Sequence, residues 1–474
     1  MRTTDTPPDP ATVTAARSPD RDGPRGWDVA LRRLTRSADH GALWFAVAGA
    51  VGLSGRRGQR AAVRGVLSLA MASGVANSLI KPLVGRRRPD PGRTRLARQI
   101  GQQPWTSSFP SGHAASAVAF ATGVGLEFPV AGAVLAPLAA AVAYSRVHVG
   151  VHYPSDVVVG AMIGAGVAVL GRRWWPVQPA GPARTRPASA PALPAGAGLV
   201  VVVNPGSGSA AGAVHTLTRL LPRVTVVEWD PATDDLEALL PGDAPALGAA
   251  GGDGTIAAVA ALAHRRGIPL AAFPFGTMNH FAQALGLDEP AQTAAAVTAG
   301  TAGGVDVGRI DGELFVNTAS LGGYPEMVEL RDRLAHRMGK WPATAVALFR
   351  TLRHTRPIDL SVNGRRQPVW LLFVGNGIYQ PPGLAPAHRV DLAGGRLGVQ
   401  FLRADRRFAR TRGVLLSLIG LIDRSEVFRE LRVSELLIDS HSGPLPPAHD
   451  GEVGAPAAHF RLRIDERPLT VYRP

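Results

Sequence analysis

Three short polar segments in the first third of the chain hold residues suited to phosphate chemistry. They are Lys81-Pro82-Leu83-Val84-Gly85-Arg86-Arg87-Arg88-Pro89, Pro110-Ser111-Gly112-His113, and Ser145-Arg146 followed by His152 and Asp156. Together they supply cations, two imidazoles and a carboxylate. One imidazole can attack phosphorus, the other can protonate the leaving oxygen, and the cations can stabilise the charge that develops. This set can hydrolyse a phosphate ester without a metal.

The spacing within these segments assigns a role to each residue. His152 is the expected nucleophile, because Asp156 four residues later would lie beside it on one helix face and orient it. His113 is the expected general acid. The expected phosphate-binding residues carry a positive charge or stand where a helix begins, with its N–H groups pointing at the anion. They are Lys81, Arg88, Ser111, Gly112 and Arg146.

The segments lie at the ends of apolar stretches that we predict to be membrane helices. These cover roughly residues 39–54, 61–80, 112–128, 129–144 and 156–171. Most are short against the ~20 residues that a bilayer core requires, but their Ala and Gly content permits close helix packing. Pro129 is expected to break the chain into a hairpin, which returns Arg146 to the side of His113. A soluble Ala-rich helical bundle is the alternative.

Taken together, the Lys-x6-Arg-Pro, Pro-Ser-Gly-His and Ser-Arg-x5-His-x3-Asp spacings resemble the type 2 phosphatidic acid phosphatase superfamily. The resemblance covers about residues 40–171. It implies a membrane helical bundle, a phosphohistidine intermediate at His152 and no cofactor. It also implies lipid phosphate or pyrophosphate substrates, such as phosphatidic acid or a polyprenyl pyrophosphate.

The composition of the chain indicates which classes of molecule it can bind. The formal net charge is +15, which favours anionic partners such as lipid headgroups and phosphorylated substrates. No basic patch is interleaved with aromatic residues, so nucleic acid is not expected. The absence of cysteine excludes disulfides and thiolate metal sites. Residues 1–38 are predicted to be a disordered or interfacial tail and not a signal peptide. The oligomeric state stays open.

The composition changes after the region 39–173, which we assign to the membrane domain. Residues 174–198 are rich in Pro and Ala and are predicted to be a linker. Residues 199–304 alternate apolar strands with helical patterns, which is typical of an α/β domain with a parallel sheet. Residues 305–474 hold short strands and Gly/Pro turns.

Three glycine-containing segments in the second half indicate a nucleotide phosphate site. Each follows an apolar run: Asn204-Pro205-Gly206-Ser207-Gly208, Gly251-Gly252-Asp253-Gly254-Thr255, and Pro274-Phe275-Gly276-Thr277-Met278-Asn279. Glycine lets the backbone approach phosphate, and the helix that follows presents its N-terminus to the anion. Near the end of the chain, Asp450-Gly451-Glu452 offers a carboxylate that can act as a base.

In this order, the segments resemble the diacylglycerol kinase catalytic domain and related bacterial lipid kinases over about residues 199–474. The predicted fold is therefore multidomain: an all-α membrane helical bundle followed by a two-part α/β plus β-sandwich lipid kinase domain. The resemblance implies ATP and Mg²⁺, with Glu452 deprotonating the hydroxyl of a diacylglycerol-like lipid and with Asp253 and Asp391 near the metal. It implies a nucleotide site lined by Asn204, Gly252, Asp253, Gly254, Thr255 and Thr277.

Three positions depart from the commoner pattern of that family. His280 follows Asn279 where many members have Asp, and Gly394 and Gly398 stand where carboxylates are usual. Fewer carboxylates weaken a site for a hard cation. Either Mg²⁺ arrives mainly with the nucleotide, or the kinase activity is reduced.

The sequence thus predicts a bifunctional membrane lipid enzyme. Because ATP is cytosolic, five crossing helices would place the kinase in the cytoplasm and the phosphatase site on the outer face of a multi-pass cell-membrane protein. The arginines of the N-terminal tail and of residues 81–98 favour the opposite orientation. Three alternatives remain: a nucleotide- or lipid-sensing second half, an undecaprenyl-pyrophosphate phosphatase joined to a kinase for another lipid alcohol, and a soluble structural protein.

Overall fold

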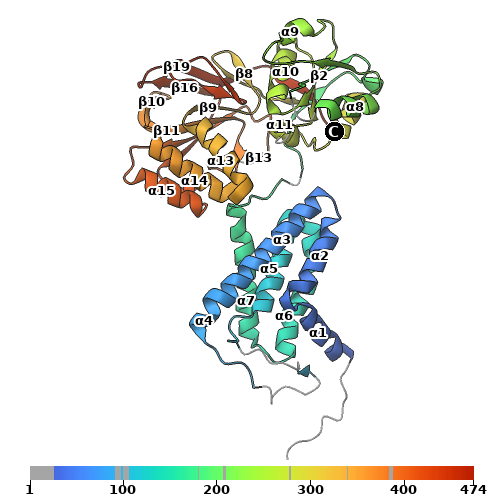
Figure 1. Ribbon diagram of the computed structural model, residues 1–474, viewed down its shortest axis with the longest axis vertical. Helices are drawn as coiled ribbons and strands as arrows, with labels where there is room; N and C mark the ends of the chain where they lie inside the picture. The colour runs from blue at the N-terminus through green and yellow to red at the C-terminus, as the bar shows by residue number, and fades with distance from the viewer. Residues whose placement is uncertain are drawn as a thin grey trace, which may run out of the picture. The chain divides into compact units, whose positions relative to one another are not determined.

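The fold is described from a computed structural model (Figure 1). The structure describes residues 26–90, 98–99, 106–179, 181–206, 210–276, 279–338, 340–383 and 388–474. The chain divides into two compact units, Met1–Val177 and Gln178–Pro474. Part of the predicted tail is ordered, since Gly26–Ser37 forms helix α1 with Asp28 and Thr35 buried. Residues 1–25 of that prediction lie outside the described residues.

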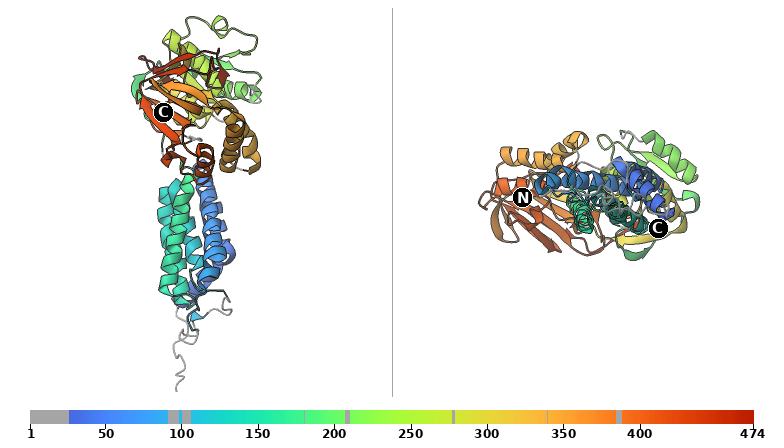
Figure 2. Two further views of the ribbon diagram at one scale, coloured as in Figure 1. Left: turned by 90° about the vertical axis from the view of Figure 1, so that its left-hand side faces the viewer. Right: turned by 90° about the horizontal axis from the view of Figure 1, so that it is seen from below.

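The first unit is a bundle of helices that run side by side (Figures 1 and 2). Its described α-helices are α1, α2 Ala42–Gly52, α3 Arg56–Gly74, α4 Lys81–Val84, α5 Gly112–Glu127, α6 Pro129–His148 and α7 Pro154–Leu170. A π-helix, η3 Val75–Ile80, joins α3 to α4. The central helix is α5, which packs against α3, α6 and α7. Every apolar stretch predicted to be helical is helical.

Three described segments are long and apolar enough to cross a membrane. They are Arg56–Val84, Pro129–His148 and Pro154–Arg173. The predicted first membrane helix is shorter than a bilayer requires, because α2 has only 11 residues. The predicted hairpin at Pro129 is present: α5 ends at Glu127, and Pro129 is the first residue of α6.

Glycines let two of these helices approach closely. A Cβ added to Gly160 of α7 would overlap the carbonyl oxygen of Ser111, and one added to Gly164 would overlap that of Ala115. The Gly160-x3-Gly164 spacing puts both glycines on one face of α7. This face brings the start of α7 against the start of α5, where the predicted phosphatase residues lie.

Ion pairs stabilise the end of the bundle where α5 finishes, away from the predicted phosphatase residues. Glu127 is buried at the end of α5 and pairs with Arg64 at 2.7 Å and Arg60 at 2.9 Å. The guanidinium groups of these arginines lie 4.6 and 4.7 Å from the ring of Trp175. Trp175, which follows the last apolar helix, is thus held against α3 by cation–π contacts.

The second unit begins with a seven-stranded sheet in its described residues. The strand order is β1-β6-β20-β5-β4-β2-β3, and β2 to β5 run parallel. Helix α10 Asp253–Arg266 packs on one face, while α8 Ala210–Leu220 and α12 Pro290–Ala299 pack on the other. The strands are β1 Arg186–Ser189, β2 Leu199–Val203, β3 Thr225–Glu228, β4 Ala246–Gly251, β5 Leu270–Pro274, β6 Thr301–Val305 and β20 Leu469–Tyr472.

Two strands of this sheet come from outside the predicted range 199–304. Strand β1 lies in the predicted linker 174–198 and pairs along its whole length with β6. Strand β20, at the end of the chain, lies between β5 and β6. Both strands differ from the predicted domain bounds because they pair with strands that are distant in the sequence. Local composition does not reveal such pairing.

The rest of the second unit is a mainly antiparallel sheet that branches at β11 Arg365–Asn376. The first part of β11 pairs with β10, and its second part lies between β9 and β14. Helices α13 Tyr324–Met338, α14 Lys340–His354 and α15 Ala409–Leu418 cover one face. The other strands are β7 Gly308–Ile310, β8 Glu313–Phe315, β9 Thr318–Gly322, β10 Ile358–Val362, β14 Leu397–Arg403, β15 Phe428–Val433, β16 Glu435–Ser440, β17 Ala448–His449, β18 Glu452–Val453 and β19 His459–Ile464.

Candidate active sites

His152 lies in the loop between α6 and α7 and is 3% exposed. Its Nδ1 atom lies 2.6 Å from the carbonyl oxygen of Ser108. A carbonyl oxygen only accepts hydrogen bonds, so Nδ1 carries the proton and donates it. Nε2 therefore holds the lone pair, which is the state that a nucleophile requires.

The orienting partner of His152 differs from the prediction. Helix α7 begins at Pro154, so His152 precedes the helix and does not share a helix face with Asp156. Nδ1 of His152 lies 3.6 Å from Asp156, farther than from Ser108. Asp156 instead accepts from the backbone N–H of Tyr153 at 2.9 Å and pairs with Arg86 at 2.8 Å. Sequence reasoning gave no role to Ser108 or Arg86.

Three predicted cations, Lys81, Arg88 and Arg146, act electrostatically on His152. Burial and the positive charges of Arg88, Arg146 and Lys81 lower the pKa of His152 to about 2. The imidazole is therefore neutral over the whole physiological pH range. The three predicted cations are therefore close enough to His152 to disfavour its charged form.

Arg146 is the cation with an unsatisfied donor. It is buried on α6, and its Nη1 donates to the hydroxyl of Thr35 on α1 at 2.7 Å. Its Nε is buried and has no hydrogen-bond partner among the described residues. Such a donor is costly unless a ligand accepts from it, and a phosphate oxygen is a matching acceptor.

Lys81 and Arg88 make different contacts. The Nζ of Lys81 donates to Asn77 at 2.7 Å. The guanidinium of Arg88 donates to the backbone carbonyl oxygens of Thr106 at 2.8 Å and Val151 at 2.9 Å. Arg88 therefore joins the loop before α5 to the loop before α7, and its charge still acts on His152.

The start of α5 holds the remaining predicted residues. Ser111 is the N-cap, and its N–H donates to the carbonyl oxygen of Asp156 at 2.9 Å. A Cβ added to Gly112 would lie 2.8 Å from the side chain of Asn77, so this turn leaves no room for a larger residue. His113 follows in the first turn of α5.

Asp39 is a site residue that the sequence did not indicate. It lies in the short helix η2 Asp39–Gly41, and its Oδ1 is 2.8 Å from Nε2 of His113. The preceding helix α1 adds Thr35, which contacts Arg146, and Asp28, which contacts His148 at 2.7 Å. The only signal in the sequence was that residues 27–40 can form an amphipathic helix.

The predicted nucleotide site gathers at one edge of the parallel sheet. Asn204 follows β2, Gly252 follows β4, and Gly276 follows β5. The N–H of Gly276 donates to the carbonyl oxygen of Gly251 at 3.0 Å, and a Cβ added to Gly276 would overlap the Cα of Gly252. The carboxyl ends of parallel strands are where ligands bind in open α/β sheets.

Asp253 is the first residue of α10, ahead of Gly254 and the buried Thr255. Its carboxylate accepts from the backbone N–H groups of His280 at 3.0 Å and Phe281 at 3.1 Å, at the start of α11 His280–Ala284. The Nδ2 of Asn317 also donates to it, at 3.4 Å. Thr277 lies outside the described residues.

Glu452 is exposed in the hairpin of β17 and β18. The carboxylate of Asp450 in the turn accepts from three backbone N–H groups, those of residues 316–318, at 2.6 to 2.9 Å. The hairpin is therefore fixed beside Asn317, which itself reaches Asp253. The structure thus links Glu452 to the nucleotide edge through Asp450.

Both predicted metal residues, Asp253 and Asp391, have partners within the protein. Asp391 pairs with Arg184 at 2.9 Å and accepts from the N–H of Ala393. Among the described residues, no cluster of three or more His, Asp or Glu side chains could hold a metal ion. At Gly398 a Cβ would lie 2.8 Å from the carbonyl oxygen of Gly377, so a carboxylate has no room there. A metal site that involves Asp253 and Asp391 stays a prediction.

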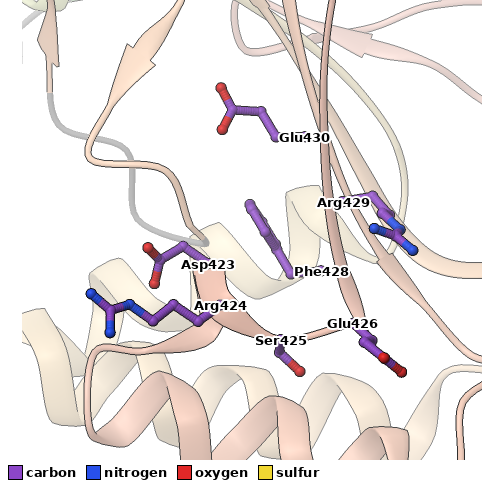
Figure 3. Close-up of a pocket in the computed structure, with 7 residues that line it drawn as sticks. All are labelled: Asp423, Arg424, Ser425, Glu426, Phe428, Arg429 and Glu430. Atoms are coloured by element: carbon purple, nitrogen blue, oxygen red, sulfur yellow. The ribbon is translucent and has the colours of Figure 1, made fainter.

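A hollow in the second unit lies apart from every predicted site residue (Figure 3). It is formed where η8 Ile422–Arg424 meets β15. Its lining mixes acidic and basic side chains with one aromatic ring, so it does not offer the net positive charge that phosphate requires. The lining residues are Asp423, Arg424, Ser425, Glu426, Phe428, Arg429 and Glu430.

Comparison with known proteins finds relatives for both halves of the chain. The PAP2 superfamily model matches residues 62–179, and the diacylglycerol kinase catalytic domain model matches residues 198–310. A decaprenylphosphoryl-5-phosphoribose phosphatase of Mycobacterium tuberculosis is 38% identical over 151 residues, which are 31% of this chain and 78% of that protein. A Pseudomonas aeruginosa protein named "Probable lipid kinase YegS-like" is 33% identical over 269 residues, which are 54% of this chain and 85% of that protein.

A lipid A 1-phosphatase of Rhizobium johnstonii is 37% identical over 102 residues, 21% of this chain and 41% of that protein.

These matches confirm both predicted resemblances. The three apolar helices together with the PAP2 match identify a membrane protein. The chain belongs to the PAP2 superfamily through its first unit and to the diacylglycerol kinase catalytic domain family through its second, and so joins a phosphatase domain to a lipid kinase domain.

Proposed function

We propose that the first unit hydrolyses a lipid phosphate or pyrophosphate through a phosphohistidine at His152. The observation that supports this most is the hydrogen bond from Nδ1 of His152 to Ser108, which leaves the Nε2 lone pair among three cations. Nε2 attacks phosphorus, the bond from phosphorus to the leaving oxygen breaks, and water later cleaves the new N–P bond. The buried Nε of Arg146 donates to a phosphoryl oxygen.

His113 supplies the proton to the leaving oxygen. Asp39 accepts a hydrogen bond from Nε2 of His113 and favours the protonated imidazole by its negative charge. With its Nε2–H held by Asp39, the imidazolium donates its other proton, on Nδ1, to the leaving oxygen. Asp39 therefore acts as a positioning residue for the acid, and Ser108 does the same for the nucleophile.

Radiolabelled substrates test the phosphatase proposal. The panel consists of phosphatidic acid, a polyprenyl phosphate and a polyprenyl pyrophosphate, each labelled in the phosphate to be released. Quenching with alkaline detergent before completion should trap an alkali-stable, acid-labile label on the wild-type protein and none on His152→Ala, while His148→Asn keeps the label. A wild-type protein that turns over without any protein-bound label contradicts the phosphohistidine. The preferred substrate decides between a phosphatidic acid phosphatase and an undecaprenyl-pyrophosphate phosphatase.

The second unit, we propose, transfers the γ-phosphoryl group of ATP to the hydroxyl of a diacylglycerol-like lipid. The glycine loops after β4 and β5 lie against each other, where they can cradle phosphates beside the N-terminus of α10. Glu452 takes the proton of the lipid hydroxyl as it attacks. No step is assigned to a metal held by Asp253 and Asp391.

One observation favours a second candidate for this unit, a nucleotide- or lipid-sensing module. Arg184 neutralises Asp391, and Gly398 has no room for a carboxylate. The full chain with ATP, Mg²⁺ and mixed lipids separates the two candidates. Phosphorylated lipid that disappears in Glu452→Gln supports the kinase, whereas ATP binding without any lipid product supports the sensor.

The two sites, we propose, face opposite sides of a multi-pass cell membrane. His152 and Asp156 lie at the start of the segment Pro154–Arg173, and the chain leaves for the second unit at its end. Twenty helical residues rise about 30 Å, the thickness of the hydrocarbon core. With the kinase in the cytoplasm, the phosphatase site faces outward.

Labelling of single cysteines tests this orientation, since the natural chain has none. Leu83 is exposed near the phosphatase site, and Leu437 is exposed on β16. An impermeant maleimide should label Leu83→Cys in intact cells and Leu437→Cys only after lysis. Labelling of both positions from the same side contradicts the orientation but leaves both activities untouched.

A further inference from the structure

The outer face of α15 is unusually apolar for an exposed helix. Its inner face holds Ala409, Gly413 and Ser417, which are buried in the second unit. On the outer face, Phe408 is 68% exposed and Leu415 is 56% exposed. Leu418 and Ile419 are also exposed, and the neighbouring helix α14 adds Phe349. We name Phe349, Phe408, Leu415, Leu418 and Ile419 the α15 face.

Leu415 lies three residues before Leu418 and four before Ile419, so these side chains project from one side at the end of α15, and Phe408 precedes its first residue. Figure 1 shows α14 and α15 side by side on the same side of the sheet. The exposed side chains therefore form one apolar surface and not scattered single residues, and such a surface marks a place of contact.

Arginines flank the α15 face, and the nearest acidic residue in the sequence is Asp405, next to Arg406. Four of them lie within residues 406–412, and none of the residues 406–419 is acidic. Arg350 and Arg353 of α14 lie close by in sequence to Phe349 and are exposed. Among the described residues, none of these six arginines forms an ion pair with Asp or Glu. Apolar side chains with unpaired arginines around them match the interface of an anionic bilayer, where the rings and aliphatic groups enter and the arginines meet phosphate.

The second unit is tethered to a bilayer by its own chain. The membrane segment ends at Arg173, and Arg184 already binds Asp391 in the second unit. Ten residues lie between these points, so the two arginines are at most about 40 Å apart when the segment is extended. The membrane surface is therefore always present at a high effective concentration, whereas a soluble partner is not.

We propose that the α15 face docks the second unit onto the anionic membrane surface from which the last membrane helix emerges. The apolar side chains enter the headgroup region, and the arginines contact lipid phosphates. The docking lets a lipid alcohol be reached while its chains stay in the bilayer. This inference depends on the membrane helices and on the surface of α14 and α15, and it holds whether the second unit is a kinase or a sensor.

The full chain tests the proposal after one leucine is replaced by cysteine and labelled with an environment-sensitive fluorophore. Leu415→Cys reports on the α15 face, and Leu437→Cys is the matched control, exposed to a similar degree on β16. The labelled proteins are reconstituted in phosphatidylcholine vesicles with or without phosphatidylglycerol, and iodide is added on both sides of the membrane. The position 415 label should be shielded from iodide when phosphatidylglycerol is present and more accessible without it, while the position 437 label stays accessible in both.

Charge reversal checks the role of the arginines. Adding Arg407→Glu or Arg410→Glu to Leu415→Cys should lower the ratio of docked to undocked protein by about fivefold or more for each site. The thermal transition of the second unit verifies that these variants fold.

Two results would overturn the proposal. A position 415 label that is as accessible as the position 437 label in anionic vesicles means that the face stays in water. A label that is shielded equally in detergent and in both kinds of vesicle means that protein, not lipid, covers the face. Neither readout depends on phosphatase or kinase turnover, so failure here leaves the proposed function standing.

Discussion

Oδ1 of Asp39 lies 2.8 Å from Nε2 of His113, although the two residues are 74 positions apart. The contact joins the segment after α1 to the first turn of α5. It gives the proposed acid a carboxylate partner, while the nucleophile His152 has a neutral carbonyl partner in Ser108. Burial lowers the pKa of both imidazoles, but Asp39 opposes this at His113, whereas the pKa of His152 falls to about 2. We therefore assign the acid to His113 and the nucleophile to His152.

Asp39→Asn should slow phosphatase turnover by on the order of tenfold to a hundredfold, because the acid loses the charge that favours its protonated form. The decline in rate at alkaline pH should also begin at a lower pH. Steady-state rates with phosphatidic acid across a pH series measure both effects.

A phosphate ester with a good leaving group, such as p-nitrophenyl phosphate, separates a chemical role for Asp39 from a structural one. Such a leaving group needs little protonation, so Asp39→Asn should affect it much less. An equal loss on both substrates would show that Asp39 only supports the fold.

Arg146→Lys should lower the phosphatase kcat/KM on the order of a hundredfold. The charge remains, but the buried Nε that is proposed to donate to the phosphoryl oxygen is lost. The matched control is Thr35→Val, which removes the acceptor of Nη1 and leaves Nε in place. A control that loses as much activity as Arg146→Lys would place the effect in the packing of α1.

Asp450→Asn and Glu452→Gln should separate support of the kinase site from catalysis. The Asp450 carboxylate accepts hydrogen bonds from three backbone N–H groups. The amide of asparagine would place an N–H donor opposite one of these donors, so we expect the unfolding free energy to fall by about 2 to 4 kcal/mol. Glu452 is exposed, and its change should leave stability unaltered.

Both variants should lose lipid phosphorylation, Asp450→Asn because its hairpin is displaced and Glu452→Gln because it lacks the base. Chemical denaturation followed in parallel with kinase assays checks this pair. Equal stability of the two variants would mean that Asp450 does not fix the hairpin.

Acid should destabilise the first unit through His152. Burial and the neighbouring cations lower the pKa of His152 to about 2, whereas the unfolded chain takes up this proton near pH 6.5. The contribution is therefore complete above pH 6.5 and is lost progressively as the pH falls toward 2. Between pH 7 and pH 5 the loss is about 2 kcal/mol.

Calorimetry of the purified protein in detergent at pH 7 and pH 5 measures this loss. His152→Gln should lose less stability on acidification than the wild type, since glutamine does not titrate. The same drop in both proteins would assign the acid sensitivity to other groups.

Local patterns in the sequence were enough to place most elements. The apolar stretches, the proline at position 129 and the glycine turns after β2, β4 and β5 depend on residues close in the chain, so their secondary structure follows from periodicity and backbone preference. The motif residues could be grouped for the same reason, because each motif stands at the end of a predictable helix or strand. His113, His152 and Arg146 are examples.

Only the tertiary structure decided which atoms meet. Ser108 holds His152, Asp39 holds His113, and Arg184 from the presumed linker neutralises Asp391. Strands β1 and β20 enter a sheet whose other strands lie far away in the chain. Each of these contacts joins residues that are distant in sequence, and its energy depends on a packed arrangement that no local pattern records. The residue types determined the chemistry that this protein can perform, and the packing determined which partner each residue has for it.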